Sequence, residues 1–358
     1  MFLDFDRLHL KLIHHFSYPN WIILDEITQN GFMRTAFVTG AAGHVGGNLV
    51  RQLLSKGWSV RCLIHHDTRA LEGVSVERIE GNLSDKKQLT NQMVGCDALF
   101  HTAAYVAVEH VNIEKMKAIN VDGTSAICQA AIDAQIPKLI HFSSVHAFQQ
   151  RPTDQPLIED RPLVSWGESA PYDQTKAAAQ RVVYDACDRG LNASILHPTG
   201  VLGPYDFKPS RMGQVIMDIL NKKMPFTINN GFNWVDVRDV CESAINCVDA
   251  GKQGQHYILP GEWATFRQIS DIISQQIGQR TAYGTLPFWT AYTALPFAYV
   301  FSKLTGNRPS FSRGSLHALS LQCKDVPGTL AKAELGHTPR SLQHTIQDTV
   351  DWMIKHAD

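Results

Sequence analysis

A glycine-rich turn between a predicted strand and a predicted helix constrains the fold more than any other feature of this chain. Residues 35–40 read TAFVTG, a short β-rich run, and residues 41–58 carry apolar side chains at helical spacing. Between them lie Gly40, Gly43 and Gly46, which form a GxxGxxG turn. Glycines there allow a tight turn and let backbone N–H groups approach a pyrophosphate at the helix N-terminus. The turn therefore predicts a dinucleotide-binding unit.

The segments that follow alternate between strand and helix patterns. Strands of this kind, separated by helix-length segments, indicate βαβ units and a parallel sheet. We therefore predict an α/β fold with a Rossmann-type, doubly wound parallel sheet. The expected strands cover 35–40, 59–66, 97–104, 138–145 and 193–200, with helices at 85–94 and 120–134 between them.

The end of the second strand bears on the choice of cofactor. NAD sites usually carry an acidic residue there to bind the ribose 2′-hydroxyl. This chain offers His65 and His66, with Arg69 close by and Asp67 as the only acid. Cationic or neutral donors suit a 2′-phosphate better than a carboxylate does, which favours NADP, with NAD as the alternative.

Composition excludes several classes of partner. The 358 residues have a formal net charge of −1, which argues against nucleic acid held by electrostatics. Seven dispersed cysteines without a CxxC pair indicate reduced thiols and a cytoplasmic protein. The histidines show no metal-ligand spacing with Cys or Glu, so no metal site is expected.

Two tyrosines precede a lysine by four positions, which places both side chains on one face of a helix. They are Tyr172 with Lys176 and Tyr299 with Lys303. Pro171 suits the first turn of a helix. A nearby ammonium would lower the tyrosine pKa and give a plausible acid/base. The spacing alone does not choose between the two pairs.

Residues 281–302 carry no charged side chain, a length that could nominally cross a bilayer. Pro287 and Pro296 weaken that interpretation, so we expect no integral span and favour a pocket wall or a surface-docking helix pair. Residues 1–32 do not resemble a signal peptide and are of uncertain status, because Met33 directly precedes the first predicted strand.

An ordered series of motifs resembles the extended short-chain dehydrogenase/reductases of the NAD-dependent epimerase/dehydratase family. It reads TGAAGHVG, GNLSD, FHTAA, NVDGT, FSSVHAF, YDQTK and HPTGVLGP, and the resemblance covers roughly 35–345. The dihydroflavonol-4-reductase-like branch is the most similar, and NNGFNWVDVRDV at 229–240 also matches it. The family implies an NAD(P)-dependent reductase or dehydrogenase.

The resemblance assigns roles to four catalytic residues. Tyr172 would be the acid/base, Lys176 would lower its pKa and hold the nicotinamide ribose, and Ser144 would hydrogen-bond the developing alkoxide. Asn120 would support a proton relay through water. Tyr299 lies far beyond the cofactor half and is interpreted as a packing residue.

The resemblance also implies a set of cofactor contacts. The sequence departs from the family pattern at three positions: His197 stands in place of the usual arginine, Asn82 in place of an aspartate, and His65 where the branch often has arginine. The expected cofactor-binding residues are Gly40, Gly43, His44, Val45, Gly46, His65, Arg69, Asn82, Leu83, Thr102, Ala103, Ala104, Lys176 and Pro198.

Three functions compete. The first is an NADP-dependent oxidoreductase that reduces the carbonyl of a largely apolar small molecule, or oxidises the matching alcohol. The second is a nucleotide-sugar epimerase with tightly bound NAD, in which Arg211, Arg308 or Arg313 would bind a diphosphate. The third, a non-catalytic cofactor sensor, does not explain the Ser-Tyr-Lys set. Val145 and His146 replace the Asp-Glu pair of the sugar 4,6-dehydratases, which argues against dehydration.

An aromatic-rich segment favours the first function, because it suits an apolar ligand. We expect it to form a wall over the nicotinamide. It contains Phe288, Trp289, Tyr292, Phe297, Tyr299, Phe301 and Phe311.

We expect a smaller, interleaved C-terminal substrate-binding region beside the Rossmann domain. The N-terminal extension covers 1–32. The Rossmann domain covers 33–200, and 229–259 returns to it. The substrate region covers 201–228 and 260–345, and 346–358 forms the end of the C-terminal helix. The final helix places Leu342, Ile346 and Val350 on one stripe. The family implies a homodimer through the helix that carries Tyr172.

Overall fold

The computed structural model describes residues 33–65, 67–107, 111–305 and 313–356, with side chains omitted at 297–305. From Thr35 onward the chain forms one compact unit. Its centre is a seven-stranded sheet in the order β3-β2-β1-β4-β5-β6-β10, in which every neighbouring pair is parallel. This is the doubly wound order that reverses between β1 and β4.

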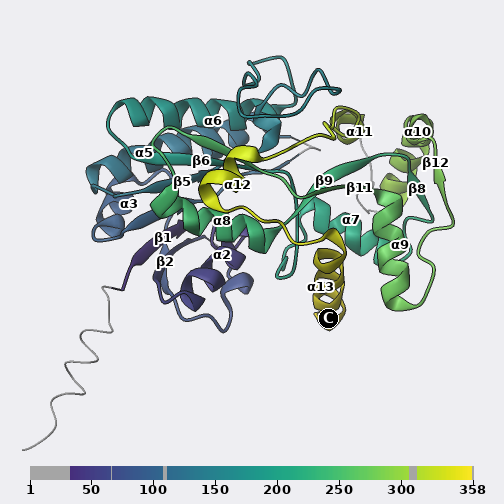
Figure 1. Ribbon diagram of the computed structural model, residues 1–358, viewed down its shortest axis with the longest axis horizontal. Coiled ribbons are helices and arrows are strands. Elements are labelled where there is room, and N and C mark those ends of the chain that lie inside the picture. Colours follow the sequence, from purple (N-terminus) through teal and green to yellow (C-terminus); the bar gives the residue numbers. More distant parts are fainter. Residues whose placement is uncertain (1–32, 66, 108–110, 306–312, 357–358) are drawn as a thin grey trace, which may run out of the picture. The chain divides into compact units, whose positions relative to one another are not determined.

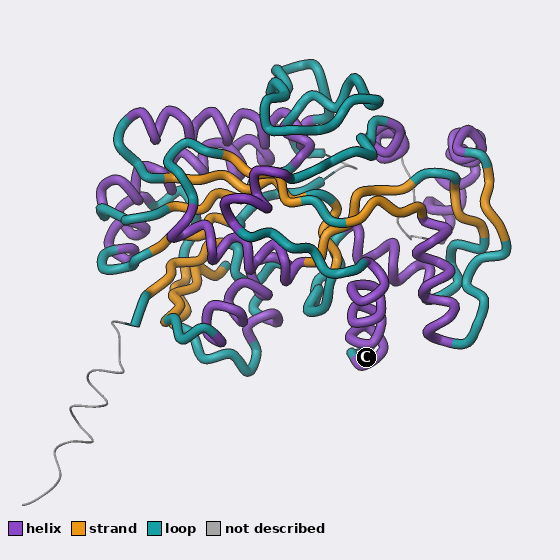
Figure 2. Tube along the Cα trace, in the orientation of Figure 1, coloured by secondary structure: helices purple, strands orange, loops and turns teal. Residues whose placement is uncertain are grey.

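Helices cover both faces of this sheet (Figure 2). The strands are nearly continuous apolar runs, as expected for strands buried on both sides. They are β1 (Thr35–Thr39), β2 (Ser59–Ile64), β3 (Glu77–Glu80), β4 (Ala98–His101), β5 (Leu139–Phe142), β6 (Ala193–Pro198) and β10 (His256–Leu259).

Two apolar clusters form the core on either side of the sheet. Helices α2 (His44–Ser55) and α8 (Val237–Ala250) pack on one face, around Phe100 and Tyr257. Helices α3 (Lys86–Met93), α5 (Gly123–Asp133) and α6 (Pro171–Asp188) cover the other face. Figure 1 shows these layers, and the predicted Rossmann-type fold is confirmed.

The rest of the chain builds a second group of elements. Two small sheets join segments that are distant in the sequence, and helices pack around them through a third apolar cluster. The strands are β7 (Gly200–Leu202), β8 (Phe226–Ile228), β9 (Gly231–Asp236), β11 (Glu262–Thr265) and β12 (Gly284–Leu286). The helices are α7 (Arg211–Leu220), α9 (Phe266–Ile277), α10 (Phe288–Thr305), α11 (Arg313–Ser320) and α13 (Leu342–Lys355). Helix α12 (Thr329–Leu335) packs instead against α8 and β10, as part of the first cluster.

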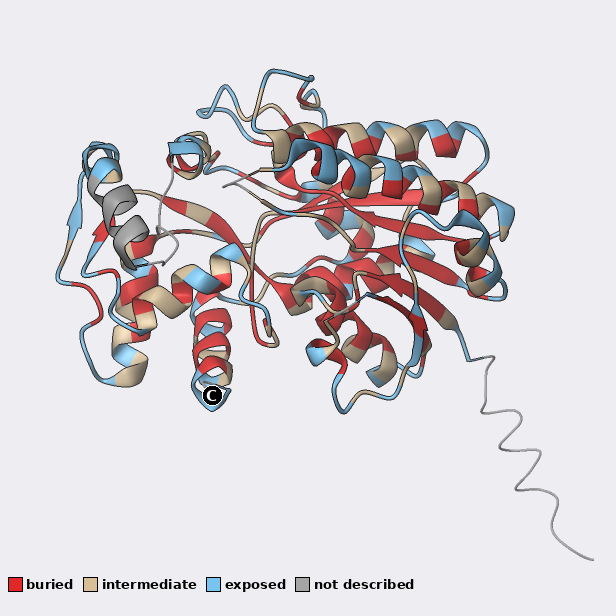
Figure 3. Ribbon diagram, turned by 180° about the vertical axis from the view of Figure 1, so that it is seen from behind, coloured by how far each residue is buried: buried red, intermediate tan, exposed pale blue. Residues whose placement is uncertain are grey.

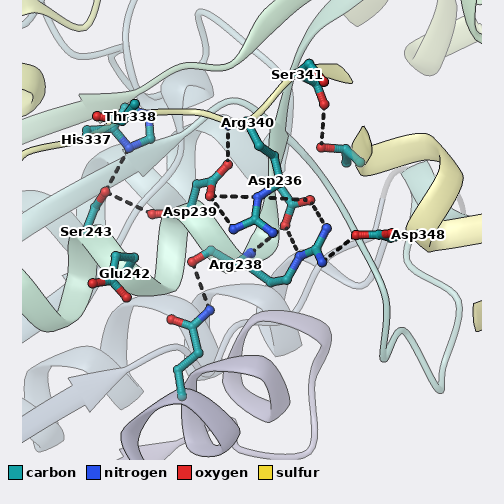
Figure 4. Close-up of polar contacts among 12 residues, drawn as sticks. Asp236, Arg238, Asp239, Glu242, Ser243, His337, Thr338, Arg340, Ser341 and Asp348 are labelled. Atoms are coloured by element: carbon teal, nitrogen blue, oxygen red, sulfur yellow. Dashed lines mark hydrogen bonds and ion pairs between the residues drawn. The ribbon is translucent and has the colours of Figure 1, made fainter. Parts of the chain in front are cut away.

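A buried ion-pair cluster ties β9 and α8 to the C-terminal segment (Figure 4). Arg238 donates to both carboxylate oxygens of Asp236, at 2.9 and 2.7 Å, and to Asp348 of α13 at 2.6 Å. Arg340 donates twice to Asp239. Burial would raise the Asp236 pKa, but the hydrogen bonds and charges of Arg238 and Arg340 hold it below its ordinary value. The VDVRD motif at 235–239 therefore binds α13 and the segment that precedes it through ion pairs.

The seven cysteines are all free and buried. None of the helices in the described part of the chain combines the length and apolarity needed to span a bilayer. The final helix α13 buries Leu342, Ile346 and Val350, as its apolar stripe predicts.

Candidate active site

The glycine turn follows β1 at the point where the strand order reverses. Gly40 has φ +71°, and a Cβ on it would lie 2.6 Å from the backbone nitrogen of Ala103. A Cβ on Gly46 would lie 2.2 Å from the Gly40 carbonyl oxygen. Both positions therefore require glycine.

The first turn of α2 is free of competing side chains. Gly43 is its N-cap without a side-chain hydrogen bond, and no acidic residue stands in the first turn. The backbone N–H groups there are suited to an anion such as a pyrophosphate. The residues present therefore fit a dinucleotide in the position that the sequence predicts.

The neighbouring predicted contacts have internal partners. His44 Nε2 lies 3.2 Å from the Pro204 carbonyl oxygen, and Val45 packs partly buried against the core. Thr102 follows β4 and donates to the Thr39 carbonyl at 2.7 Å. Ala103 and Ala104 continue this loop, and the buried Pro198 ends β6.

The turn after β2 has a feature that the sequence did not reveal. Arg69 donates to both carboxylate oxygens of Asp67, at 3.0 and 2.7 Å, and both side chains reach solvent. The hydrogen bond from Arg69 lowers the Asp67 pKa to about 2. The Asp67 carboxylate, which would favour NAD, and the Arg69 guanidinium, which would favour NADP, thus pair with each other. His65 is exposed at the end of this strand, and His66 lies outside the described residues.

Asn82 and Leu83 follow β3. The Asn82 carbonyl oxygen accepts from the Ser84 backbone N–H at 2.8 Å and from its hydroxyl. Leu83 packs partly buried against the core, and a Cβ on Gly123 would lie 2.9 Å from Leu83 Cδ1. Asn82 itself is exposed.

Ser144 and Tyr172 meet where β5 ends and α6 begins. Ser144 follows β5, is 8% exposed, and lies close enough to Tyr172 for its hydroxyl to lower the tyrosine pKa. Pro171 opens α6, as expected, because its missing N–H costs nothing in the first turn. The arrangement brings the predicted hydroxyl pair together from segments 28 residues apart in sequence.

The electrostatics of Tyr172 differ from expectation. Burial raises its pKa to about 12; the nearby Ser144 hydroxyl opposes this shift, and the charge of Asp173 reinforces it. Lys176 is not among the groups that shift it. The Lys176 ammonium is buried and donates to the Phe142 carbonyl at 2.8 Å, and burial lowers its own pKa to about 8. In this arrangement the Tyr172 phenol is therefore protonated at neutral pH.

Asn120 lies in a π-helical turn, Ala118–Asp122, a distortion frequent at functional sites. Its side chain accepts from the Tyr105 backbone N–H at 2.7 Å and donates to the Tyr105 carbonyl and to Thr175 Oγ1. Thr175 in turn donates to the Tyr172 carbonyl at 2.9 Å. Both amide hydrogens are thus used within the protein, so Asn120 anchors the loop after β4 to α6.

His197 is the second residue whose contact the sequence did not reveal. It is fully buried, and its Nδ1 lies 2.9 Å from the Ser144 carbonyl oxygen. Its ring packs 4.5 Å from that of Phe148. In the position where the family pattern has arginine, the chain thus holds the backbone of Ser144 with a neutral donor. No signal local to His197 indicates this contact.

The aromatic segment expected as a wall carries exposed side chains. Tyr283 and Trp289 are 67% and 64% exposed, and Tyr292 is exposed as well. Arg211 and Arg313 are exposed at the starts of α7 and α11. The side chains of Phe297, Tyr299 and Phe301, and residues Arg308 and Phe311, lie outside the described residues.

Comparisons with known proteins agree with this geometry. The model of the NAD dependent epimerase/dehydratase family matches residues 36–259. The chain is 32% identical to Sterol demethylase protein B of Methylococcus capsulatus, over 89% of this chain and 98% of that protein. It is also 32% identical to a putative dihydroflavonol 4-reductase of Synechocystis sp., over 90% and 95%.

Among solved structures, that of gox2253 has a TM-score of 0.77 at 31% identity and covers 90% of this chain and 98% of its own. The matches extend over nearly the whole of each relative. The chain belongs to the NAD-dependent epimerase/dehydratase family and is an NAD(P)-dependent oxidoreductase of the extended short-chain dehydrogenase/reductase type.

Proposed function

We propose that the protein is an NADP-dependent reductase that acts on a carbonyl group of a largely apolar small molecule. The observation that carries this proposal is the proximity of the Ser144 hydroxyl to Tyr172, with Tyr172 protonated at neutral pH. A neutral phenol can give a proton to the oxygen of a carbonyl under reduction, which is the direction that a raised pKa favours.

The reaction needs two transfers. When bound, the nicotinamide supplies hydride to the carbonyl carbon. Tyr172 gives its phenolic proton to the oxygen, and Ser144 donates a hydrogen bond that stabilises the developing negative charge. The Gly40–Gly46 turn would hold the pyrophosphate, and Lys176 the ribose hydroxyls. Since the Lys176 pKa is about 8, the ammonium stays charged at pH 7.

The substrate class is supported by the relatives rather than by the aromatic segment. The first relative is named for sterols and the second for a dihydroflavonol, so both names point to apolar ring systems. The alternative is a nucleotide-sugar epimerase. Of the arginines predicted for that function, Arg211 and Arg313 are described, and both begin helices at the surface.

A panel of carbonyl compounds tests this function. Each methylene that enters an apolar site contributes roughly 0.8 kcal/mol, so kcat/KM should rise along a homologous ketone series. The assay follows NADPH oxidation for the ketones and epimerisation for UDP- and GDP-sugars. A flat response to chain length, together with epimerised sugar and NAD retained after purification, would select the epimerase.

Arg69→Ala tests the cofactor preference. We expect several-fold weaker NADPH binding and a smaller effect on NADH, because the substitution removes a charged donor for the 2′-phosphate. Asp67→Asn is the matched control, since it releases Arg69 from its carboxylate partner and should strengthen NADPH binding. Titration of NADPH and NADH against the unmodified enzyme and the two variants measures the preference. Tighter binding of NADH than of NADPH by the unmodified enzyme would contradict it.

We also propose the division into a Rossmann domain, 33–200 with 229–259, and a substrate region, 201–228 with 260–345. β10 joins the main sheet, which supports the return of the chain, whereas β9 pairs with β7 and β11. A cytoplasmic homodimer through α5 and α6 completes the proposal.

A further inference from the structure

Helix α10 carries exposed aromatic side chains directly beside its buried face. Phe288 and Leu295 pack against the third core cluster, and Ala291, which lies between them in the sequence, is buried. Next to this buried face, Trp289 is 64% exposed, and Tyr292, whose ring lies 5.8 Å from that of Phe288, is also exposed. An ordinary surface helix places charged residues there. This helix has no charged residue before Lys303.

The neighbouring strand pair extends this surface. Phe226 of β8 lies in register with Gly284 of β12, and its ring fills the space over that glycine. Phe226, Tyr283 and Leu286 are all exposed. Figure 3 shows the exposed residues along β12 and the first turns of α10. We call this surface the aromatic face, defined by Phe226, Tyr283, Leu286, Trp289 and Tyr292.

Cations border the aromatic face. The Arg280 guanidinium lies 5.6 Å from the centre of the Tyr283 ring, and Lys222 and Lys223 are exposed just before β8. The described salt bridges include none of these three residues. In sequence, no Asp or Glu occurs between Asp271 and Asp325. Arg280, Lys222 and Lys223 therefore place positive charge along one border of the aromatic face.

We propose that the aromatic face rests on an anionic membrane surface. Trp and Tyr are suited to the interface between headgroups and acyl chains, and flanking Lys and Arg are attracted to anionic lipids. A second copy of the chain is a poorer fit, because self-association would bring like charges together. The proposal does not depend on the reaction that the enzyme catalyses.

The test uses the full chain and vesicles. Phosphatidylcholine vesicles with about one third phosphatidylglycerol should bind the protein in a sedimentation assay, and vesicles of phosphatidylcholine alone should bind it much less. High salt should weaken binding to the anionic vesicles, because it screens the cations. Equal binding to both compositions, or no binding to either, would overturn the proposal.

Variants assign the binding to this face. Tyr283→Ser with Trp289→Ser should lower the partition coefficient on anionic vesicles at least about tenfold, since two interfacial aromatics are lost. Trp166→Ser is the matched control, because Trp166 is 57% exposed in a loop before α6. Unchanged binding of the double variant would place the contact elsewhere. Concentration-dependent self-association without vesicles, lost in the double variant, would show that a second copy covers the face instead.

Discussion

Tyr172→Phe should lower kcat by about 10²- to 10⁴-fold, the usual contribution of a positioned proton donor. The ring stays in place and only the hydroxyl is lost, so the affinity for NADPH should change little. Since burial sets the Tyr172 pKa to about 12, the phenol of the unmodified enzyme should remain the acid form across the neutral range. Steady-state kinetics and cofactor titration measure the two quantities separately.

Tyr299→Phe is the control within the same chain, because Tyr299 and Lys303 repeat the spacing of Tyr172 and Lys176. Its side chain lies outside the described residues, and we expect its kcat to match that of the unmodified enzyme. Loss of turnover in Tyr299→Phe with retention in Tyr172→Phe would reverse the assignment. Loss of cofactor affinity in Tyr172→Phe would instead indicate a binding role.

The parallel sheet was readable from sequence because its central strands are buried on both faces and therefore appear as apolar runs. Leu139–Phe142 is an example in which all four residues are buried. β3 was not predicted, since only Ile79 of its four residues is buried. At the edge of the sheet, the pattern ERIE carries too little apolarity to be distinguished from a loop.

The candidate site was predictable only where neighbours in sequence are also neighbours in space. The i, i+4 spacing places Tyr172 and Lys176 on one helix. The lysine's partner is the Phe142 carbonyl, 34 residues away, and its contact depends on how α6 packs on β5. Local sequence therefore could not show that burial, not the ammonium, dominates the Tyr172 pKa.

Residues 281–302 illustrate a different limit of prediction from sequence. Their lack of charge correctly indicated an unusual surface, but apolarity does not reveal which face of a helix is covered. Phe288 packs inward whereas Trp289 is exposed, and they are adjacent in sequence. The third core cluster covers one face of α10, and the wall over the nicotinamide stays a prediction.

Acidification from pH 6.5 should destabilise the enzyme steeply, because three histidines are buried on one face of the sheet. His101, His141 and His197 end or nearly end β4, β5 and β6, and all three are at most 2% exposed. Burial lowers the pKa of His101 and of His197 to about 3, with smaller effects from neighbouring charges including Lys176. The pKa of His141 lies well below 6.5 for the same reason, and nearby Lys176, His101 and His197 oppose its protonation further.

The direction of the pH dependence of stability follows from proton uptake. Between pH 6.5 and about 3 the unfolded chain protonates these histidines and the folded protein does not, so the stability present above pH 6.5 is lost as pH falls. Each histidine contributes a slope of up to about 1.4 kcal/mol per pH unit, and the three together up to about 4 kcal/mol. Against a total stability of about 5–15 kcal/mol, such a slope brings unfolding close to pH 5. Urea unfolding between pH 8 and pH 5, without cofactor, measures this loss of unfolding free energy.

His141→Leu isolates one of the three contributions. Neither ring nitrogen of His141 has a hydrogen-bond partner among the described residues, and leucine has a similar volume. The substitution should therefore remove a buried polar cost and one titrating group, giving a variant about 1–3 kcal/mol more stable than the unmodified enzyme near pH 5.5. His344→Leu, at an exposed position of α13, should leave the slope unchanged. If His141→Leu had the same pH slope as the unmodified enzyme, His141 would already bind its proton in the folded state, and acid lability would have to come from other groups.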